Sequence, residues 1–494
     1  MQSNELLYVQ LAILLPATAA LVLPLFKRRP NIRETVTLLA SASLFLICIS
    51  IYSTIDFSHQ QSIVWLTILP QLTISFSVEP LGLLFALMSS LLWFITSIYS
   101  IGYMRYHHEK NQTRFYQFFA LTMTTVIGIA FAANLFTLYV FYELLTLSTY
   151  PLVTHARNQK AKLGGRTYIA ILLLTSFLFF LPAMVGTWLV SGQVAFESGG
   201  LLSAYTSELK VIAILLPLFL LGIGKAALMP FHRWLPAAMV APTPVSALLH
   251  AVAVVKGGVF AVLKVCVFIF GENLIAMLPT TQLLLYLAGL TVLIASLIAL
   301  RQDSLKKRLA YSTVSQLSYI TLGALLANKT GIIGSAMHMV IHGFSKITLF
   351  FCAGAIIIVT GKTKISELAG LGQQMPITMS AFFIASLSII GLPPLAGAWS
   401  KWWLLLATAE AKQWLLLGIL ALSSLMNIFY LLAIPLKAFF TVPTQQISVK
   451  SDIEAPMPML IAIITCTCLC FIFFIFPEPL YELASSITHS TSGQ

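Results

Sequence analysis

The chain has 494 residues, of which 59% are apolar and only 9% carry a charge, and its mean hydropathy is +0.92. This composition excludes a soluble protein and indicates a polytopic membrane protein, with one membrane domain over residues 1–494. The formal net charge of +12 does not predict nucleic-acid binding, because the basic residues fall in short loops between apolar runs, where they orient a membrane protein.

Apolar runs of about 17 to 25 residues, the length that crosses roughly 30 Å of hydrocarbon, predict fourteen spans and an all-α fold. The spans lie near residues 6–26, 34–53, 81–101, 115–132, 134–153, 167–190, 210–229, 246–270, 282–300, 307–327, 331–359, 376–405, 413–438 and 456–477. The first span follows Glu5 and precedes Lys27, the reverse of the charged start of a signal peptide, so we expect a retained helix.

Loop charge predicts the orientation of the chain in the membrane. Most of the 28 lysines and arginines fall in the odd-numbered loops. By the positive-inside rule these loops are cytoplasmic, so both termini are expected on the outer, periplasmic side of a bacterial-type inner membrane.

Four lysines and one glutamate lie inside otherwise apolar spans: Glu143, Lys225, Lys256, Lys346 and Lys401. An ionisable group at the centre of a bilayer costs roughly 2.5 to 3.5 kcal/mol on insertion scales, and such groups typically mark ion or proton paths. Snorkelling to the interface is the alternative for a lysine near a helix end. Because Lys256 lies ten residues into its span, we favour a functional role for it.

Prolines interrupt the seventh span within MPFHRWLP (229–236) and the twelfth within GLPPLAGAWSK (391–401). Proline removes a backbone hydrogen bond and clashes with the preceding turn, so both helices are expected to be discontinuous. Broken helices at membrane depth are typical of ion paths, although a packing kink is the simpler alternative for either break alone. A buried lysine accompanies each break, Lys225 in the seventh span and Lys401 in the twelfth.

The two breaks suggest an internal duplication. Spans four to eight (115–270) and nine to thirteen (282–440) would form two units with the break in the fourth helix of each. An odd number of helices per unit makes the second enter from the opposite face, which predicts two inverted five-helix repeats. The remaining segments are the first three spans (1–114) and the last span (456–477).

Histidines accompany the buried lysines. His338, His342 and Lys346 recur every four residues, drifting about 40° per step around a helix, so they share one stripe that favours a proton relay. His250 precedes Lys256 by six residues, which places the two on different faces of a regular helix, where water could connect them.

Several other residues are weaker candidates for a functional role. His232 follows the break of span seven and is equally well a loop residue, and Glu79 at the start of span three is expected to be structural or at an interface. The alternating Cys466, Cys468 and Cys470 have no histidine or acidic companion in their span, so small apolar packing is favoured over a metal site. We expect no metal, no cofactor and no electron transfer by this chain.

Five segments together resemble a known family: 141–153 (FYELLTLSTYPLV), 222–260, 303–320, 338–354 (HMVIHGFSKITLFFCAG) and 391–403 (GLPPLAGAWSKWW). They resemble the antiporter-like membrane subunits shared by respiratory complex I, membrane-bound hydrogenases and Mrp-type sodium/proton antiporters. The resemblance runs from about the third span to the thirteenth.

The resemblance implies roles for the buried groups. Glu143 and Lys225 would form the glutamate–lysine pair of the first half-path, Lys256 the central relay, and Lys401 the end of the second half-path. Together with the histidines and Lys346 identified by their spacing, the candidate proton pathway comprises Glu143, Lys225, Lys256, Lys401, His338, His342, Lys346 and His250, with His232 and Glu79 as weaker candidates. The lysines would pass protons while sodium or another monovalent cation moves elsewhere in a multisubunit membrane assembly.

Two differences from the family pattern indicate which type of subunit this chain resembles. Lys401 stands where the M-type subunit of complex I, which otherwise resembles this pattern, has glutamate. After the fourteenth span we expect no room for the lateral helix of the L type or the large extension of the A-type Mrp protein. The segments around Lys256 and Lys401 then most resemble the D-type component of the Mrp antiporters, with the N-type subunit of complex I next. The alternative is a proton-pumping membrane-arm subunit, N- or M-like, of an NADH-quinone oxidoreductase or a hydrogenase, and it too would carry out no redox chemistry of its own.

Overall fold

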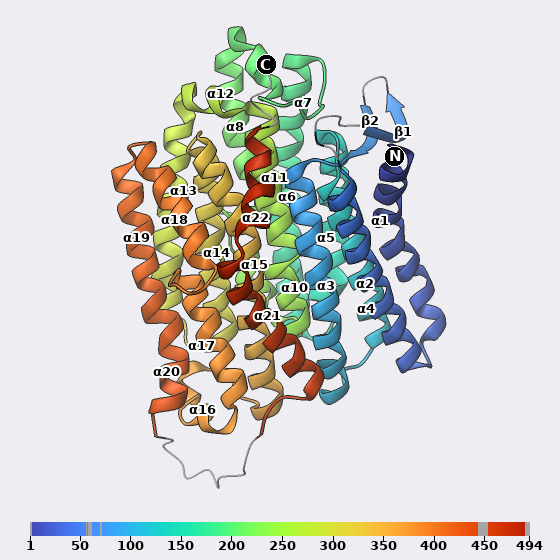
Figure 1. Cartoon of the computed structure of the whole chain (residues 1–494), viewed down its shortest axis with the longest axis vertical. Helices are drawn as coiled ribbons and strands as arrows, with labels where there is room; N and C mark the ends of the chain where they lie inside the picture. The colour runs from blue at the N-terminus through green and yellow to red at the C-terminus, as the bar shows by residue number, and fades with distance from the viewer. Residues whose placement is uncertain (1, 56, 58–61, 70–71, 443–452, 490–494) are drawn as a thin grey trace.

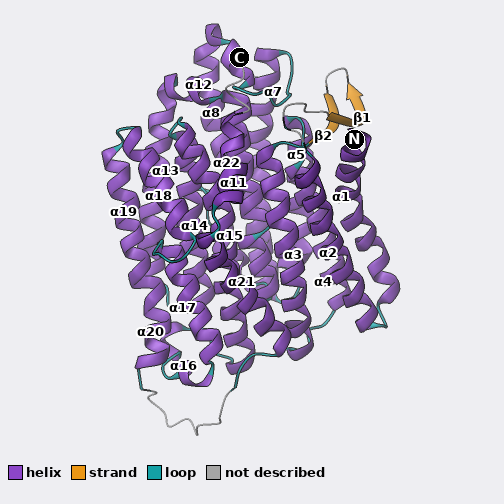
Figure 2. Cartoon of the chain, viewed as in Figure 1, coloured by secondary structure: helices purple, strands orange, loops and turns teal. Residues whose placement is uncertain are grey.

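The computed structural model describes the chain except for residues 1, 56, 58–61, 70–71, 443–452 and 490–494, and helices dominate it (Figures 1 and 2). The helices before residue 266 are α1 (Gln2–Val22), α2 (Pro30–Thr54), α3 (Pro80–Tyr106), α4 (Gln112–Ala130), α5 (Leu135–Val153), α6 (Gln159–Thr175), α7 (Leu181–Ser191), α8 (Leu209–Gly222), α9 (Trp234–Ala237), α10 (Thr243–Ala251) and α11 (Val254–Val265). Those that follow are α12 (Glu272–Met277), α13 (Pro279–Arg301), α14 (Leu305–Leu325), α15 (Lys329–Thr360), α16 (Leu371–Gln374), α17 (Pro376–Ile390), α18 (Gly397–Glu410), α19 (Trp414–Asn427), α20 (Ala433–Phe440), α21 (Met457–Ile475) and α22 (Glu478–His489).

Local sequence explains where several helices begin. Asn134, Asn158 and Asn328 precede α5, α6 and α15, and each side-chain oxygen accepts a hydrogen bond from a backbone N–H of the first turn. Proline occupies the first turn of α2, α3, α13 and α17, where its missing N–H costs no hydrogen bond.

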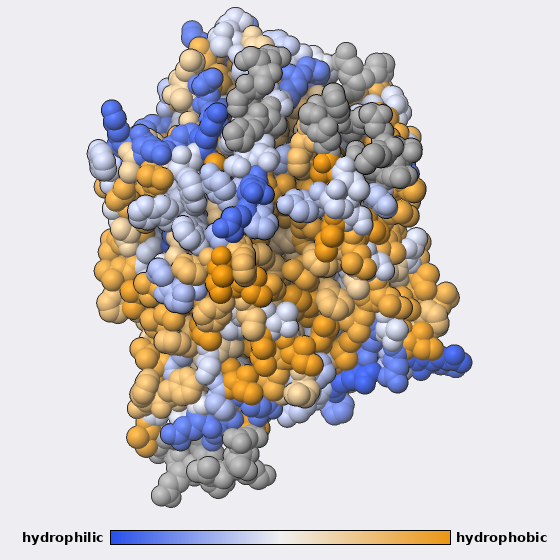
Figure 3. Space-filling view, viewed as in Figure 1, coloured by the Kyte–Doolittle hydropathy of each residue, from blue (hydrophilic) through white to orange (hydrophobic). Residues whose placement is uncertain are grey.

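Nine helical segments of the described chain are long and apolar enough to cross a membrane. They are Leu6–Phe26, Pro30–Thr54, Pro80–Tyr106, Gln159–Ser191, Thr243–Phe270, Pro279–Arg301, Lys329–Thr360, Trp414–Phe440 and Met457–Ile475. The visible face has a broad apolar belt between two hydrophilic ends, as expected for a protein surrounded by lipid (Figure 3). The all-α membrane fold is confirmed, and the count of fourteen spans and the inverted repeat stay predictions.

The beginning of α1 and the end of α22 lie at the same end of the bundle (Figure 1). α15 runs through the interior, in contact with α3, α10, α14, α17, α18 and α21, and its residues from 331 to 356 are all buried. A polar group on α15 is therefore removed from both lipid and bulk water.

The seventh span is interrupted, but the break begins earlier than the prolines indicate. α8 ends at Gly222, and Lys225 lies in a short 3-10 turn, η5 (Gly224–Ala226). A Cβ at Gly222 would collide with the backbone of Phe180, so the close approach of α8 to the helical segment that contains Phe180 requires glycine here. Lys225 thus lies inside the break rather than before it.

The twelfth span is broken between α17 and α18, as the prolines predict. Gly391 takes a left-handed conformation with φ +93°, and the helix resumes at Gly397. A further interruption was not predicted: α10 ends at Ala251 and α11 starts at Val254, so span eight is broken between His250 and Lys256. No proline or glycine marks that position in the sequence.

Two peripheral elements were also missed. Strands β1 (Ser62–Leu69) and β2 (Leu72–Ser77) form an antiparallel hairpin in the loop after α2. The side-chain amide of Asn134 donates to the carbonyl of Thr73 and to the hydroxyl of Ser75, which fastens β2 to the start of α5. Helix α22 packs on α3 and α15 beyond the last predicted span.

Candidate functional site

Lys225 is completely buried and is held by one residue of α5. Its Nζ donates to the carbonyl of Tyr142 at 2.7 Å and lies 3.1 Å from the centre of the Tyr142 ring. Its backbone N–H donates to the Tyr142 hydroxyl at 3.1 Å. An ammonium held by a carbonyl and an aromatic face is stabilised without a bound counterion.

Glu143 follows Tyr142 on α5 but forms no ion pair with Lys225 among the described residues. Both carboxylate oxygens of Glu143 are buried and lack a hydrogen-bond partner in the described protein. Native proteins normally satisfy such groups through ordered water. Glu143 and Lys225 therefore lie in one region of the protein, but their side chains do not make the direct contact expected of a glutamate–lysine pair.

Lys256 and His342 form the junction between the two halves of the chain. Nζ of Lys256 on α11 lies 2.7 Å from Nδ1 of His342 on α15, and both side chains are buried. Sequence analysis placed Lys256 and His342 in the same pathway but did not predict this contact. The break between α10 and α11 separates His250 from Lys256, and His250 packs its ring against Phe350 at 4.6 Å.

His338 continues the interior stripe one turn before His342, with the two ring centres 5.8 Å apart. Its Nδ1 lies 2.9 Å from the hydroxyl of Ser400, and its Nε2 lies 3.1 Å from the side-chain oxygen of Gln316. Ser400 immediately precedes Lys401 on α18. His338 thus links the junction to the second break.

Lys401 reaches back across the break of the twelfth span. Its Nζ donates to the carbonyl of Ile390, the last residue of α17, at 3.1 Å, and to the hydroxyl of Ser424 at 2.8 Å. A carbonyl at a helix C-terminus carries partial negative charge and lacks an intrahelical donor, so it suits an ammonium. A Cβ at Gly391 would lie 2.7 Å from Cδ of Lys401, so this glycine leaves room for the lysine stem.

Lys346, the third member of the predicted stripe, points to α14. Its Nζ donates to the hydroxyl of Ser312 at 2.7 Å, and Ser312 accepts from the hydroxyl of Tyr430 at 3.3 Å. The stripe is therefore divided, because His338 and His342 lie between Lys256 and Lys401 while Lys346 faces another helix.

Hydroxyl groups between α14 and α19 run from Lys346 towards Lys401. Ser296 of α13 lies 3.0 Å from Ser315 and 2.9 Å from Ser423, and the Tyr319 hydroxyl lies 3.3 Å from that of Ser424. We call this set the hydroxyl ladder; its members are Ser296, Ser312, Ser315, Tyr319, Ser423, Ser424 and Tyr430. The hydroxyl ladder is not predictable from the sequence, because serines in an apolar helix often bond only to their own backbone.

A second glutamate–lysine pair lies near the hairpin end of the bundle. Lys264 on α11 is completely buried, and its Nζ contacts the carboxylate of Glu79, just before α3, at 2.6 Å. Lys264 also donates to the carbonyl of Ala132 and lies 4.4 Å from the centre of the Phe196 ring. The sequence placed Lys264 late in span eight without indicating a role for it, although its spacing of eight from Lys256 puts both on one side of the helix.

His232 is half-buried beyond the break of span seven, 6.2 Å from the ring of Tyr311, and away from the buried lysines. The structure thus aligns a set of residues that we call the interior polar chain: Lys256, His342, His338, Ser400, Lys401 and Ser424. Lys256 contacts His342, His338 contacts Ser400, and Lys401, the next residue after Ser400, donates to Ser424. Lys225 with Tyr142 and Lys346 with the hydroxyl ladder lie beside it. This architecture defines a class of polytopic membrane protein with ionisable side chains aligned through its interior.

Comparison with known proteins identifies the family. A model described as NADH:quinone oxidoreductase/Mrp antiporter, transmembrane, matches residues 132–427. One described as NADH-ubiquinone oxidoreductase (complex I), chain 5 N-terminus, matches residues 65–116. The chain belongs to the NADH:quinone oxidoreductase/Mrp antiporter family of membrane proteins.

Named relatives come from quinone oxidoreductases. NADH-quinone oxidoreductase subunit N of Desulforudis audaxviator is 32% identical over 335 residues, which cover 67% of this chain and 66% of the relative. Chloroplastic NAD(P)H-quinone oxidoreductase subunit 5 of Adiantum capillus-veneris is 34% identical over 397 residues, covering 74% of this chain and 52% of the relative. The chain matches about two thirds of the first relative and about half of the second.

Solved structures share the whole fold. A chain of the membrane-bound sulfane sulfur reductase, an archaeal respiratory membrane complex, matches with a TM-score of 0.86 at 24% identity, covering 98% of this chain and 97% of that one. A chain of the Mrp complex from Dietzia sp. DQ12-45-1b matches with a TM-score of 0.86 at 19% identity, covering 98% of each chain. Both belong to multisubunit membrane complexes.

Proposed function

We propose that this chain is the proton-conducting subunit of a multisubunit monovalent cation/proton antiporter, corresponding to the D-type component of the Mrp assemblies. The observation that carries the proposal is the 2.7 Å contact between Lys256 and His342 at the centre of a buried chain of ionisable groups. A lysine ammonium hydrogen-bonded to an imidazole can transfer a proton to it without either group leaving its helix. Electrostatic repulsion among the buried lysines would drive the next step.

The proposed proton movement runs between the two breaks. Lys225 exchanges its proton with Glu143 through water, and Lys256 passes a proton from Nζ to Nδ1 of His342. The resulting imidazolium releases a proton from Nε2, which has no protein partner among the described residues. Water carries it to His338, and Ser400 and a further water pass it on to Lys401, whose neutral amine accepts it and becomes an ammonium held by Ile390 and Ser424.

Cation transport in everted membrane vesicles tests the proposal. Lys225→Gln and Glu143→Gln should abolish the sodium-induced collapse of a preformed proton gradient, while every subunit still copurifies. Lys210→Gln is the matched control, because this exposed lysine begins α8 outside the buried set. Wild-type exchange in either site variant contradicts the assignment.

A second candidate is a membrane-arm subunit of an NADH-quinone oxidoreductase or a hydrogenase. It is favoured by the names of the relatives, which are subunits of quinone oxidoreductases. The vesicle experiment separates the two functions. If the gradient collapses on adding sodium alone, the antiporter is supported; if Lys225→Gln instead abolishes acidification driven by NADH or another reductant, the oxidoreductase is supported. Mass spectrometry of the purified assembly identifies the other subunits.

A further inference from the structure

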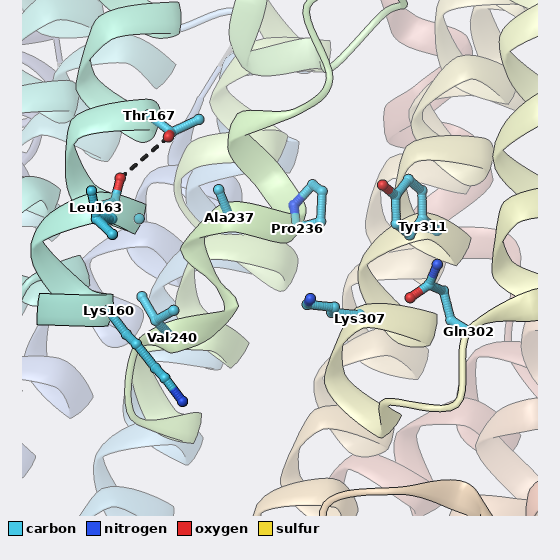
Figure 4. A pocket seen from close by; sticks show the side chains of 10 residues that line it. Lys160, Leu163, Thr167, Pro236, Ala237, Val240, Gln302, Lys307 and Tyr311 are labelled. Carbon is cyan, nitrogen blue, oxygen red and sulfur yellow. Dashed lines mark hydrogen bonds between the residues drawn. The ribbon is translucent and has the colours of Figure 1, made fainter.

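A cavity of about 480 Å³ opens beside the break of the seventh span. It lies between α6, the α9 segment and the start of α14, and Figure 4 shows Lys160 and Lys307 on the walls made by α6 and α14. This volume is typical of sites for small organic ligands. None of the residues of the interior polar chain lines it.

The cavity offers two uncommitted cations. Among the residues that the structure describes, no carboxylate pairs with Lys160 or Lys307, and both are exposed. The adjacent Lys306 differs, because its Nζ donates to the carbonyl of Ala241 at 2.6 Å. Gln302 and Tyr311 add polar groups to the wall beside Lys307.

Asp303, the acidic residue next to Gln302 in the chain, does not pair with these lysines. Asp303 accepts hydrogen bonds from the backbone N–H of Ser366 at 2.9 Å and from its hydroxyl at 2.8 Å. Burial raises the pKa of Asp303, but the bonds from Ser366 and the positive charges of Lys364 and Arg308 outweigh it and leave the pKa below its usual value. Asp303 is therefore ionised but directed at another turn, and the cavity keeps its positive charge.

An apolar track leads away from the cavity along α6 and the π-helical turn that follows it, η2 (Ser176–Phe180). Leu163 lines the cavity, and Leu174 and Leu178 continue the same helical stripe, each about half exposed. The stripe follows the helix axis, which is the direction of a lipid acyl chain in a bilayer. A cationic head site with an apolar track matches an amphiphilic anion better than a soluble one.

We propose that this cavity binds an anionic phospholipid, with its phosphate between Lys160 and Lys307 and an acyl chain along the α6 stripe. Basic pockets between membrane helices attract anionic headgroups, which are enriched in the leaflet that faces the basic loops. The lipid covers the flank of the seventh-span break and excludes bulk water there. An acidic segment of a partner subunit could use the same lysines, but it would not require the exposed leucine stripe.

The test is lipid retention by the purified full assembly. We expect wild-type protein in phosphatidylcholine vesicles containing phosphatidylglycerol to bind phosphatidylglycerol selectively, and each lysine removed to weaken binding about fivefold. Lys160→Gln combined with Lys307→Gln should therefore lower the affinity roughly 25-fold. The control, Lys27→Gln combined with Lys162→Gln, removes the same charge from exposed sites outside the cavity and should bind normally.

Three results would overturn the lipid site. They are equal retention by the two double variants, full displacement by millimolar inorganic phosphate, which indicates a free-anion site, and a cross-link from Leu163→Cys to another subunit, which indicates a protein partner. Because the readout is bound lipid, the outcome does not depend on whether the assembly exchanges sodium.

Discussion

Among the residues that the structure describes, two glutamate–lysine combinations in the interior differ in whether their charged groups touch. Glu79 and Lys264 touch at 2.6 Å and are surrounded by the carbonyl of Ala132 and the ring of Phe196. Glu143 and Lys225 do not touch, because Lys225 is bound by the carbonyl and ring of Tyr142. Both lysines are completely buried.

The difference indicates which combination stabilises the folded protein and which is able to exchange protons. A buried ion pair in direct contact is held in one geometry, because separating its members would leave two desolvated charges without a partner. A carboxylate and an ammonium kept apart can change charge independently as water or a neighbouring charge moves. We therefore propose that Glu79 and Lys264 serve stability, and that Glu143 and Lys225 serve transport.

The largest expected effect is on stability. Glu79→Gln should destabilise the protein by about 3 to 5 kcal/mol, because it leaves Lys264 as an unpaired buried charge. Thermal unfolding of the purified assembly in detergent measures the loss. Combining Glu79→Gln with Lys264→Met should recover much of it, whereas a double variant no more stable than the single one would refute the assignment.

Proton flux should also fall strongly when the lysine at the second break is replaced. Lys401→Gln removes a group that exchanges a proton directly, so proton flux should fall by about 100-fold. Unfolding should change little, because Lys401 bonds only to a carbonyl and a hydroxyl and leaves no buried charge unpaired. Lys412→Gln, an exposed position in the loop after α18, is the control. A large drop in melting temperature with normal proton flux in Lys401→Gln would contradict this prediction, because Lys401 would then serve stability rather than transport.

The hydroxyl ladder should contribute a smaller amount. Ser424→Ala removes the hydroxyl that links Lys401 to Tyr319, and a hydrogen bond to a charged group is worth about 1.5 to 3 kcal/mol. We expect a loss of proton flux of roughly tenfold, measured by quenching of a pH-sensitive dye in proteoliposomes. Ser386→Ala is the matched control, because the Ser386 hydroxyl bonds only to the carbonyl of Phe382 in its own helix. Equal proton flux in the two variants would show that the hydroxyl ladder does not contribute to proton movement.

The smallest effect is expected at Tyr142. Tyr142→Phe keeps the ring and the carbonyl that hold the Lys225 ammonium, and loses only the hydroxyl that accepts from the Lys225 backbone. This loss should cost about 1 kcal/mol and reduce flux by no more than about fivefold. Tyr142→Ala removes the aromatic face as well and should be clearly worse in the same assay; identical rates for the two variants would exclude a role for the ring.

The membrane architecture was predictable from sequence because apolar runs and prolines act locally. The runs gave the helices, and the prolines at 393 and 394 marked the break between α17 and α18. The start of the other large break was not predictable, since it depends on the contact of Gly222 with Phe180, a residue in another helix. The break before Lys256 has no proline or glycine, so only tertiary packing explains it.

The candidate site was partly predictable, because helical periodicity is also a local property of the sequence. Periodicity identified His338 and His342 as neighbours on one stripe, and the structure places them between Lys256 and Lys401. Periodicity could not show that Lys346 turns towards Ser312, because that depends on how α14 packs against α15. Lys264 could have been found by applying the same spacing argument to α11.

Proton flux through the Lys256→Gln assembly is the most direct test of the interior polar chain. The purified complex, reconstituted in liposomes, is given a pH step, and the internal pH is followed with a trapped dye. If the contact between Lys256 and His342 joins the two halves, flux should fall to the level of empty liposomes while subunit composition is unchanged and Lys27→Gln conducts normally. Undiminished flux in Lys256→Gln would contradict the account, because protons would then cross without the junction.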